Sequence, residues 1–207
     1  MRPTRPILFL SRDFDAGFGM IEMLAVIAIV LLLTVLIWKP RFTSAAQRQR
    51  ATCADQLQKI HLALELYAQD SRGGFPTNTA ARVPEDALRL LVPQYCSDIG
   101  LFLCPGQPPR HAPSATDVFH SDYAYYMGRR AGDVTDAILT DAQVNDAAKG
   151  AGQLLFSADG KAPGNNHSDG GGNVLFVDGH VEASPPRAAF PLPLQPGVVL
   201  LNPKPQP

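Results

Sequence analysis

One carboxylate, Glu22, stands at the start of a long apolar run near the beginning of the chain. The run Met23–Trp38 reads MLAVIAIVLLLTVLIW and contains no charged residue. A charged side chain at the centre of a bilayer costs roughly 2.5–3.5 kcal/mol on insertion scales, so such a residue is expected to be functional and to have a partner. If the chain is cut after Gly17, Phe18 carries a free amine, and the amine of a neighbouring copy could neutralise Glu22.

The residues around Glu22 resemble the cleavage site of type IV prepilins and type II secretion pseudopilins, in which Gly is followed by Phe-Thr-Leu-Ile-Glu and an apolar helix. Four positions match this pattern: Gly17, Phe18, Ile21 and Glu22. Gly19 departs from it but leaves the cut site and Glu22 intact. The resemblance implies cleavage between Gly17 and Phe18 by a prepilin peptidase, and N-methylation of Phe18. It also implies three kinds of partner: the peptidase, other pilin or pseudopilin subunits, and an inner-membrane assembly platform.

The apolar run is longer than the core of about 7–15 residues found in secretory signals, and a span of about 20 residues suits a membrane helix. We therefore expect a cleaved leader (1–17), a transmembrane helix segment in contact with lipid (18–38) and an amphipathic continuation (39–72). The continuation has one apolar face, at Leu57, Ile60, Leu64 and Tyr67. An ordinary single-pass anchor is the alternative reading of the same run.

A globular head is expected over residues 73–184. Tyr123–Met127 and Ala137–Leu139 favour strands, and Leu154–Phe156 is a further candidate strand. The segment Asn173–Val177 is followed by the turn pair Asp178-Gly179, which predicts a β-hairpin with residues 180–182. A short helix is expected at 85–91.

Residues 185–207 contain eight prolines, so this tail is expected to be extended and not to form a central strand. The fold class predicted from these elements is α+β and type IV pilin-like. In it a long N-terminal helix, whose first half is transmembrane, packs on a small antiparallel sheet.

A second resemblance covers much of the remaining chain. Cys53, the pair Cys104-Pro105, the strand Tyr123-Ala124-Tyr125, and His167 with Asp178-Gly179 are similar to positions of a large pilin-like family of planctomycetes and their relatives. Those proteins have nine residues between the histidine and Asp-Gly, whereas this chain has ten. The match supports the expected fold more than it specifies a biochemical role.

Oxygen-bearing residues gather on the glycine-rich loops of the C-terminal half: Asp159, Asn166, Asp169 and Asp178. Calcium takes six to eight oxygen ligands, so these four residues are candidate Ca²⁺ ligands. Major pseudopilins resemble this chain in having a calcium-bearing loop late in the sequence. The alternative is turn chemistry, since Asp and Asn tolerate left-handed backbone. Zinc binding by His167 and His180 is less favoured, because no matched Cys/His spacing accompanies them.

Three cysteines leave the thiol chemistry open. Cys96 and Cys104 are candidates for a disulfide if the head is outside the cytoplasm. Cys53 could instead pair with Cys104, or all three thiols could be reduced and partly buried.

The sequence contains no nucleophile elbow, no His-Glu-x-x-His and no phosphate loop, so an enzyme is not expected. The net charge of −1 gives no excess of positive charge of the kind that indicates nucleic-acid binding. The leading hypothesis is a pseudopilin or pilin of a type II secretion or type IV pilus-like filament. Its expected location is the bacterial inner membrane, single-pass with a periplasmic head, and then the pseudopilus or cell surface. The alternative is a membrane-anchored periplasmic or surface binding protein that uses the same export signal.

Overall fold

The computed structural model describes residues 19–37, 45–107 and 119–204. The chain forms two compact units, residues 1–42 and 43–207. The first unit contains one described helix, α1 (Met20–Ile37). The predicted cleavage site between Gly17 and Phe18 lies outside the described residues.

The second unit is built on a long helix, α2 (Ala45–Asp70), and a five-stranded antiparallel sheet. In the sequence, three short helices follow α2 and precede the first strand: α3 (Pro84–Leu88), η1 (Arg89–Leu91) and η2 (Ile99–Phe102). The strands, all of them short, are β1 (Tyr123–Met127), β2 (Ala137–Asp141), β3 (Gly172–Phe176), β4 (Val181–Ser184) and β5 (Val199–Leu201). Their order across the sheet is β4-β3-β2-β1-β5.

The predicted fold class is wrong in its main feature, the single long N-terminal helix with a transmembrane first half. The structure has two separate helices, with α1 ending at Ile37 and α2 beginning at Ala45. In the part of the chain that the structure describes, no helix is both long and apolar enough to cross a membrane.

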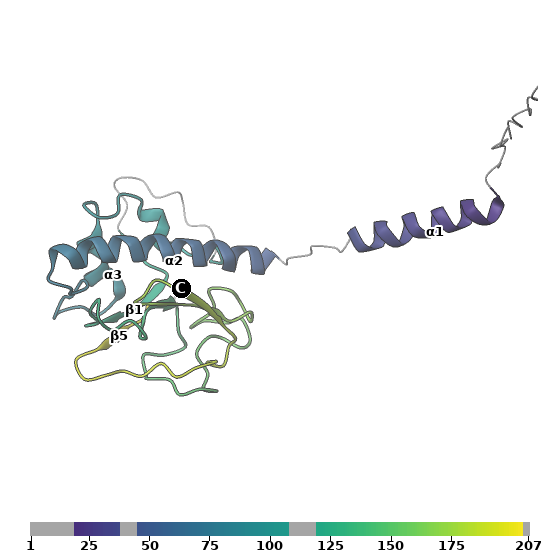
Figure 1. The fold of residues 1–207 in the computed structure, drawn as a ribbon. Helices are drawn as coiled ribbons and strands as arrows, with labels where there is room; N and C mark the ends of the chain where they lie inside the picture. Colours follow the sequence, from purple (N-terminus) through teal and green to yellow (C-terminus); the bar gives the residue numbers. More distant parts are fainter. Residues whose placement is uncertain (1–18, 38–44, 108–118, 205–207) are drawn as a thin grey trace, which may run out of the picture. The chain divides into compact units, whose positions relative to one another are not determined.

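Alternation along β1 divides the core of the second unit into two layers. Tyr123 and Tyr125 face the layer that contains the buried side of α2, and Ala124 and Tyr126 face the opposite layer. Figure 1 shows α2 lying over the sheet, and α2 contacts β3 and β4. The apolar face predicted for this helix is thus the face that it buries against the sheet.

The opposite layer is covered by chain without regular secondary structure. Residues 155–156 and the proline-rich tail supply the buried side chains of this cover, among them Leu155, Phe156, Ala188 and Leu192. The tail also supplies β5, which pairs with β1 at the edge of the sheet. The prediction that this tail forms no central strand is therefore confirmed, and its residues 199–201 form an edge strand.

Shortening a side chain on the buried face of α2 is expected to weaken the second unit. Ile60 is fully buried, so Ile60→Val should lower the free energy of unfolding by about 0.5–1.5 kcal/mol. Leu62, on the same helix, is 63% exposed, and Leu62→Ala should change it by no more than about 0.5 kcal/mol. Urea denaturation of the two variants measures the difference. Equal losses would contradict the orientation of α2.

Candidate functional site

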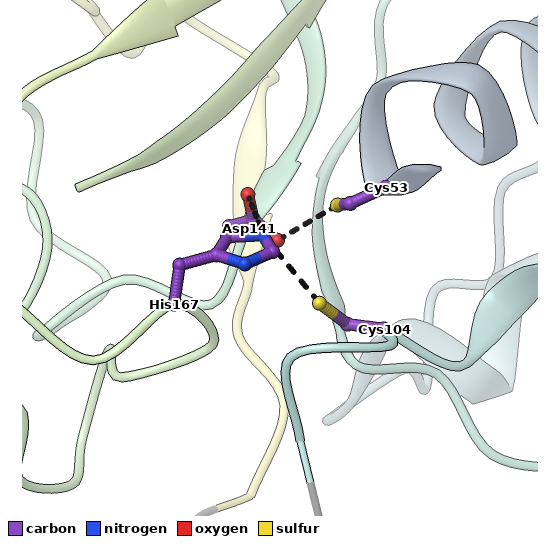
Figure 2. A group of neighbouring side chains, drawn as sticks. All are labelled: Cys53, Cys104, Asp141 and His167. Atoms are coloured by element: carbon purple, nitrogen blue, oxygen red, sulfur yellow. Dashed lines mark hydrogen bonds and ion pairs between the residues drawn. The ribbon is translucent and has the colours of Figure 1, made fainter. Parts of the chain in front are cut away.

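Four side chains with ligand-type atoms converge inside the second unit (Figure 2): Cys53, Cys104, Asp141 and His167. All four are buried, and their sulfur, oxygen and nitrogen atoms lie within 4.8 Å of one another. Among the described residues this is the one group of at least three His, Cys, Asp or Glu side chains that comes together in this way. It is therefore the strongest candidate for a site in this unit.

Each member comes from a different element. Cys53 lies on the buried face of α2, one helical turn before Leu57, so the packing that buries Leu57 also turns the Cys53 thiol inward. Asp141 is the last residue of β2, where it pairs with Tyr123 of β1. Cys104 follows η2, and His167 lies in the loop that precedes β3.

The contacts within the group are short. The Cys53 thiol donates to Asp141 Oδ1 at 3.2 Å, and His167 Nε2 lies 3.3 Å from Asp141 Oδ2 and 3.5 Å from Cys104 Sγ. Figure 2 shows the imidazole ring between the carboxylate and the Cys104 sulfur. One nitrogen, Nε2, therefore faces both an oxygen and a sulfur.

Asp141 and His167 form a buried ion pair. Burial alone raises the pKa of Asp141, but the hydrogen bond and charge of His167, with hydrogen bonds from Asn173 and Asn166, hold it below its ordinary value. Burial likewise lowers the pKa of His167, and the interactions with Asp141 and Cys53 outweigh it and raise that pKa to about 10. The carboxylate is thus ionised and is held by four partners: His167, Asn173, Asn166 and Cys53.

The two thiols of the group are protonated in this environment. Burial is the main cause of the strongly raised pKa of Cys53. A hydrogen bond with Cys53 lowers the pKa of Cys104, but burial and the Asp141 charge raise it to a net value above normal. Neither thiol therefore has the lowered pKa that marks a reactive cysteine.

The arrangement does not fit a Cys-His-Asp catalytic triad. In such a triad one ring nitrogen of the histidine faces the nucleophile and the other nitrogen faces the carboxylate. Here Cys104 and Asp141 both face Nε2 of His167, and Nδ1 is buried without a partner among the described residues. All the reactive atoms are also buried, so the group suits a bound ion better than a substrate.

The structure does not gather the four candidate calcium ligands into one site. Asp159 accepts hydrogen bonds from Ser157 Oγ and the Lys161 N–H, and Asp178 accepts one from the His180 N–H. Asp169 is exposed, whereas Asn166 is buried and donates to Asp141 Oδ1 at 2.9 Å. Asp159 and Asp178 therefore organise their own turns, and calcium binding stays a prediction.

The three cysteines are free in the structure, so the predicted Cys96–Cys104 disulfide is not formed. The Cys96 thiol donates to the Asp98 carbonyl, whereas Cys104 joins Cys53 in the buried group. The structure thus corresponds to the alternative in which all three thiols are reduced and buried, and it places Cys104 near Cys53. His167 and Asp178 have separate partners, because His167 pairs with Asp141 and Asp178 pairs with His180.

Glu22 lies in the first turn of α1, where Gly19 precedes the first helical residue. Its Oε2 accepts a hydrogen bond from the Gly19 N–H at 3.2 Å. A Glu at this third helical position that bonds back to the residue before the helix forms half of a capping box. In the single chain Glu22 therefore has a local role at the start of the helix.

Sequence reasoning missed Asp141 entirely and gave His167 little weight. The four members of the group are far apart in the sequence and have none of the short Cys/His spacings that indicate a metal site. No family model, curated protein or solved structure matches this chain. Its function must therefore be argued from its own residues.

Proposed function

We propose that this chain is a subunit of a type II secretion or type IV pilus-like filament, with α1 as the element that joins the copies. The observation that supports this most is the exposure of α1. Its large apolar side chains from Met20 to Leu33 are 48–85% exposed in the single chain. A helix that is apolar all round is normally buried, and contact with the same helix of other copies supplies that burial.

The sequence before and within α1 supports the same proposal. Gly17 and Phe18 match the cut site of prepilins, and Glu22 is the one charged residue from Met20 to Ile37. Cleavage after Gly17 places a new amine four residues before Glu22. In a packed bundle of apolar helices, the amine of one copy neutralises the Glu22 carboxylate of its neighbour, which removes two unpaired buried charges and sets the register.

The second unit serves as the displayed head in this proposal. Its sheet is covered on one face by α2 and on the other by the tail, so it has a core of its own. The partners that the proposal requires are a prepilin peptidase, other subunits of the filament and an assembly platform.

The N-terminal mass of the isolated full chain tests the proposal. When a prepilin peptidase is co-expressed, we expect a chain that starts at Phe18 and is heavier by one methyl group. Without the peptidase the chain should keep its leader. A Gly17→Leu variant is the control for the cut site, since it removes the residue after which the motif is cleaved. A chain that still starts at Met1 with active peptidase present would overturn the proposal.

A further inference from the structure

The buried group of Cys53, Cys104, Asp141 and His167 has the composition and spacing of a metal site. We propose that these four residues bind one Zn²⁺ ion, which ties α2 to the sheet. The inference concerns the second unit alone and does not depend on the proposed filament.

Two of the distances between donor atoms match those of a tetrahedral zinc site. Zinc–sulfur bonds of about 2.3 Å and zinc–nitrogen or zinc–oxygen bonds of about 2.0–2.2 Å place neighbouring donors roughly 3.3–3.8 Å apart. The Nε2 of His167 is 3.5 Å from Cys104 Sγ and 3.3 Å from Asp141 Oδ2, and Cys53 Sγ is 3.2 Å from Asp141 Oδ1. All four donor atoms lie within 4.8 Å of one another, so an ion at the centre of the group requires side-chain movements that bring the more distant donors closer.

The donor types select zinc over the hard cations. Ca²⁺ and Mg²⁺ prefer oxygen, whereas thiolate and imidazole ligands suit zinc. Two sulfurs, one ring nitrogen and one carboxylate oxygen complete four-coordination. Because all four ligands are buried, no open position faces solvent. A closed site of this kind is structural and not catalytic.

Neighbouring groups already orient two of the ligands, Cys104 and Asp141. The Gly106 N–H lies 3.4 Å from Cys104 Sγ, which it can stabilise as a thiolate. Asp141 accepts hydrogen bonds from Asn166 Nδ2 at 2.9 Å and from the Asn173 N–H at 2.7 Å. Such outer contacts fix ligand geometry in metal sites, and their loss typically reduces metal affinity 10–100-fold.

The competing chemistry is a disulfide between Cys53 and Cys104. It would use the two sulfurs alone and would leave Asp141 and His167 beside an uncharged bridge. Zinc binding uses all four groups: each thiol loses its proton to solvent, as does His167 Nε2, and the four donor atoms then share the ion. The convergence of the carboxylate and the imidazole on the sulfurs favours zinc.

Metal analysis of the full chain, purified with reductant and in a detergent that covers α1, tests the proposal. We expect one zinc per chain. After the zinc is removed by a chelator, added Co²⁺ should give the visible absorption of tetrahedral cobalt and a thiolate charge-transfer band, and zinc should displace it. Cys53→Ser and Cys104→Ser should each weaken binding more than about 100-fold, beyond the 10–100-fold typical of outer contacts. Cys96→Ser is the matched control and should bind normally, because Cys96 lies outside the group.

Three results would overturn the proposal. The first is that Co²⁺ gives no thiolate charge-transfer band with the reduced wild-type chain, a measurement that does not depend on whether any variant folds. The second is unchanged metal affinity in Cys53→Ser and Cys104→Ser. The third is a Cys53–Cys104 disulfide in the chain isolated without reductant, seen by intact mass and by resistance of these thiols to alkylation.

Discussion

Glu22→Gln and Glu22→Ala should both abolish filament assembly and leave cleavage after Gly17 intact. Removing one partner of a buried charge pair costs about 3–5 kcal/mol, because the other charge stays buried and unpaired. At 1.4 kcal/mol per tenfold, each contact between subunits would weaken by roughly 140- to 3,700-fold. Isolation of filaments, with N-terminal mass analysis of the remaining chain, measures both effects.

The two Glu22 variants separate the charge from the local helix contact. Glutamine can also bond back to the residue before the helix, so Glu22→Gln is expected to keep the contact with the Gly19 N–H. Alanine removes both the contact and the charge. Glu182→Gln, at an exposed position on β4, is the matched control and should assemble normally. If Glu22→Gln assembles and only Glu22→Ala fails, Glu22 acts as a helix cap and does not pair with a neighbour's amine. If both assemble normally, a binding protein that uses the same export signal becomes the better interpretation.

Elements whose signal is local were predictable from the sequence. The pair Asp178-Gly179 predicted the turn between β3 and β4, and Gly179 has a φ of +88°, which glycine adopts without strain. The three- and four-residue spacing of Leu57, Ile60 and Leu64 predicted the buried face of α2. In each case a few neighbouring residues carry the whole signal.

Elements that depend on tertiary contacts were not predictable. Leu154–Phe156 was expected to be a strand, but the structure has there only an isolated bridge between Leu154 and Arg187. Leu155 and Phe156 are apolar because they fill the layer beneath the tail, and their N–H groups bond to the Pro186 carbonyl. A run of three apolar residues occurs both in buried loop segments and in buried strands, so its composition does not distinguish the two.

The buried group of Cys53, Cys104, Asp141 and His167 depends even more on tertiary contacts that the sequence does not reveal. Cys53 and Cys104 were recognisable as thiols, yet only the packing of α2 on the sheet places them beside Asp141. An aspartate at the end of a short strand resembles any other turn residue in sequence. The prediction of a single long N-terminal helix was wrong for a different reason. Apolar composition indicates that a segment is helical, but it does not indicate where the helix ends.

A second large effect is expected where the tail meets the sheet, at the ion pair of Arg129 and Asp136. The Arg129 side chain is 1% exposed, and its guanidinium donates to Asp136 Oδ2 at 2.6 Å and to the Pro193 carbonyl at 3.0 Å. Gln195 Nε2 also donates to Asp136 Oδ2. Asp136→Ala would leave the buried guanidinium without its counter-charge, at a cost of about 3–5 kcal/mol in the free energy of unfolding.

A double-mutant cycle isolates that interaction. Arg129→Met combined with Asp136→Ala removes both charges, so we expect the double variant to be more stable than Asp136→Ala alone. Asp178→Ala, which breaks the half-exposed pair with His180, is the surface control and should cost much less. Urea denaturation of the four chains, in the same detergent, gives the coupling energy. If the double variant loses as much as the two single variants together, the charges are not coupled. The tail would then be held by its buried apolar side chains, such as Leu192 and Leu200, and not by the ion pair.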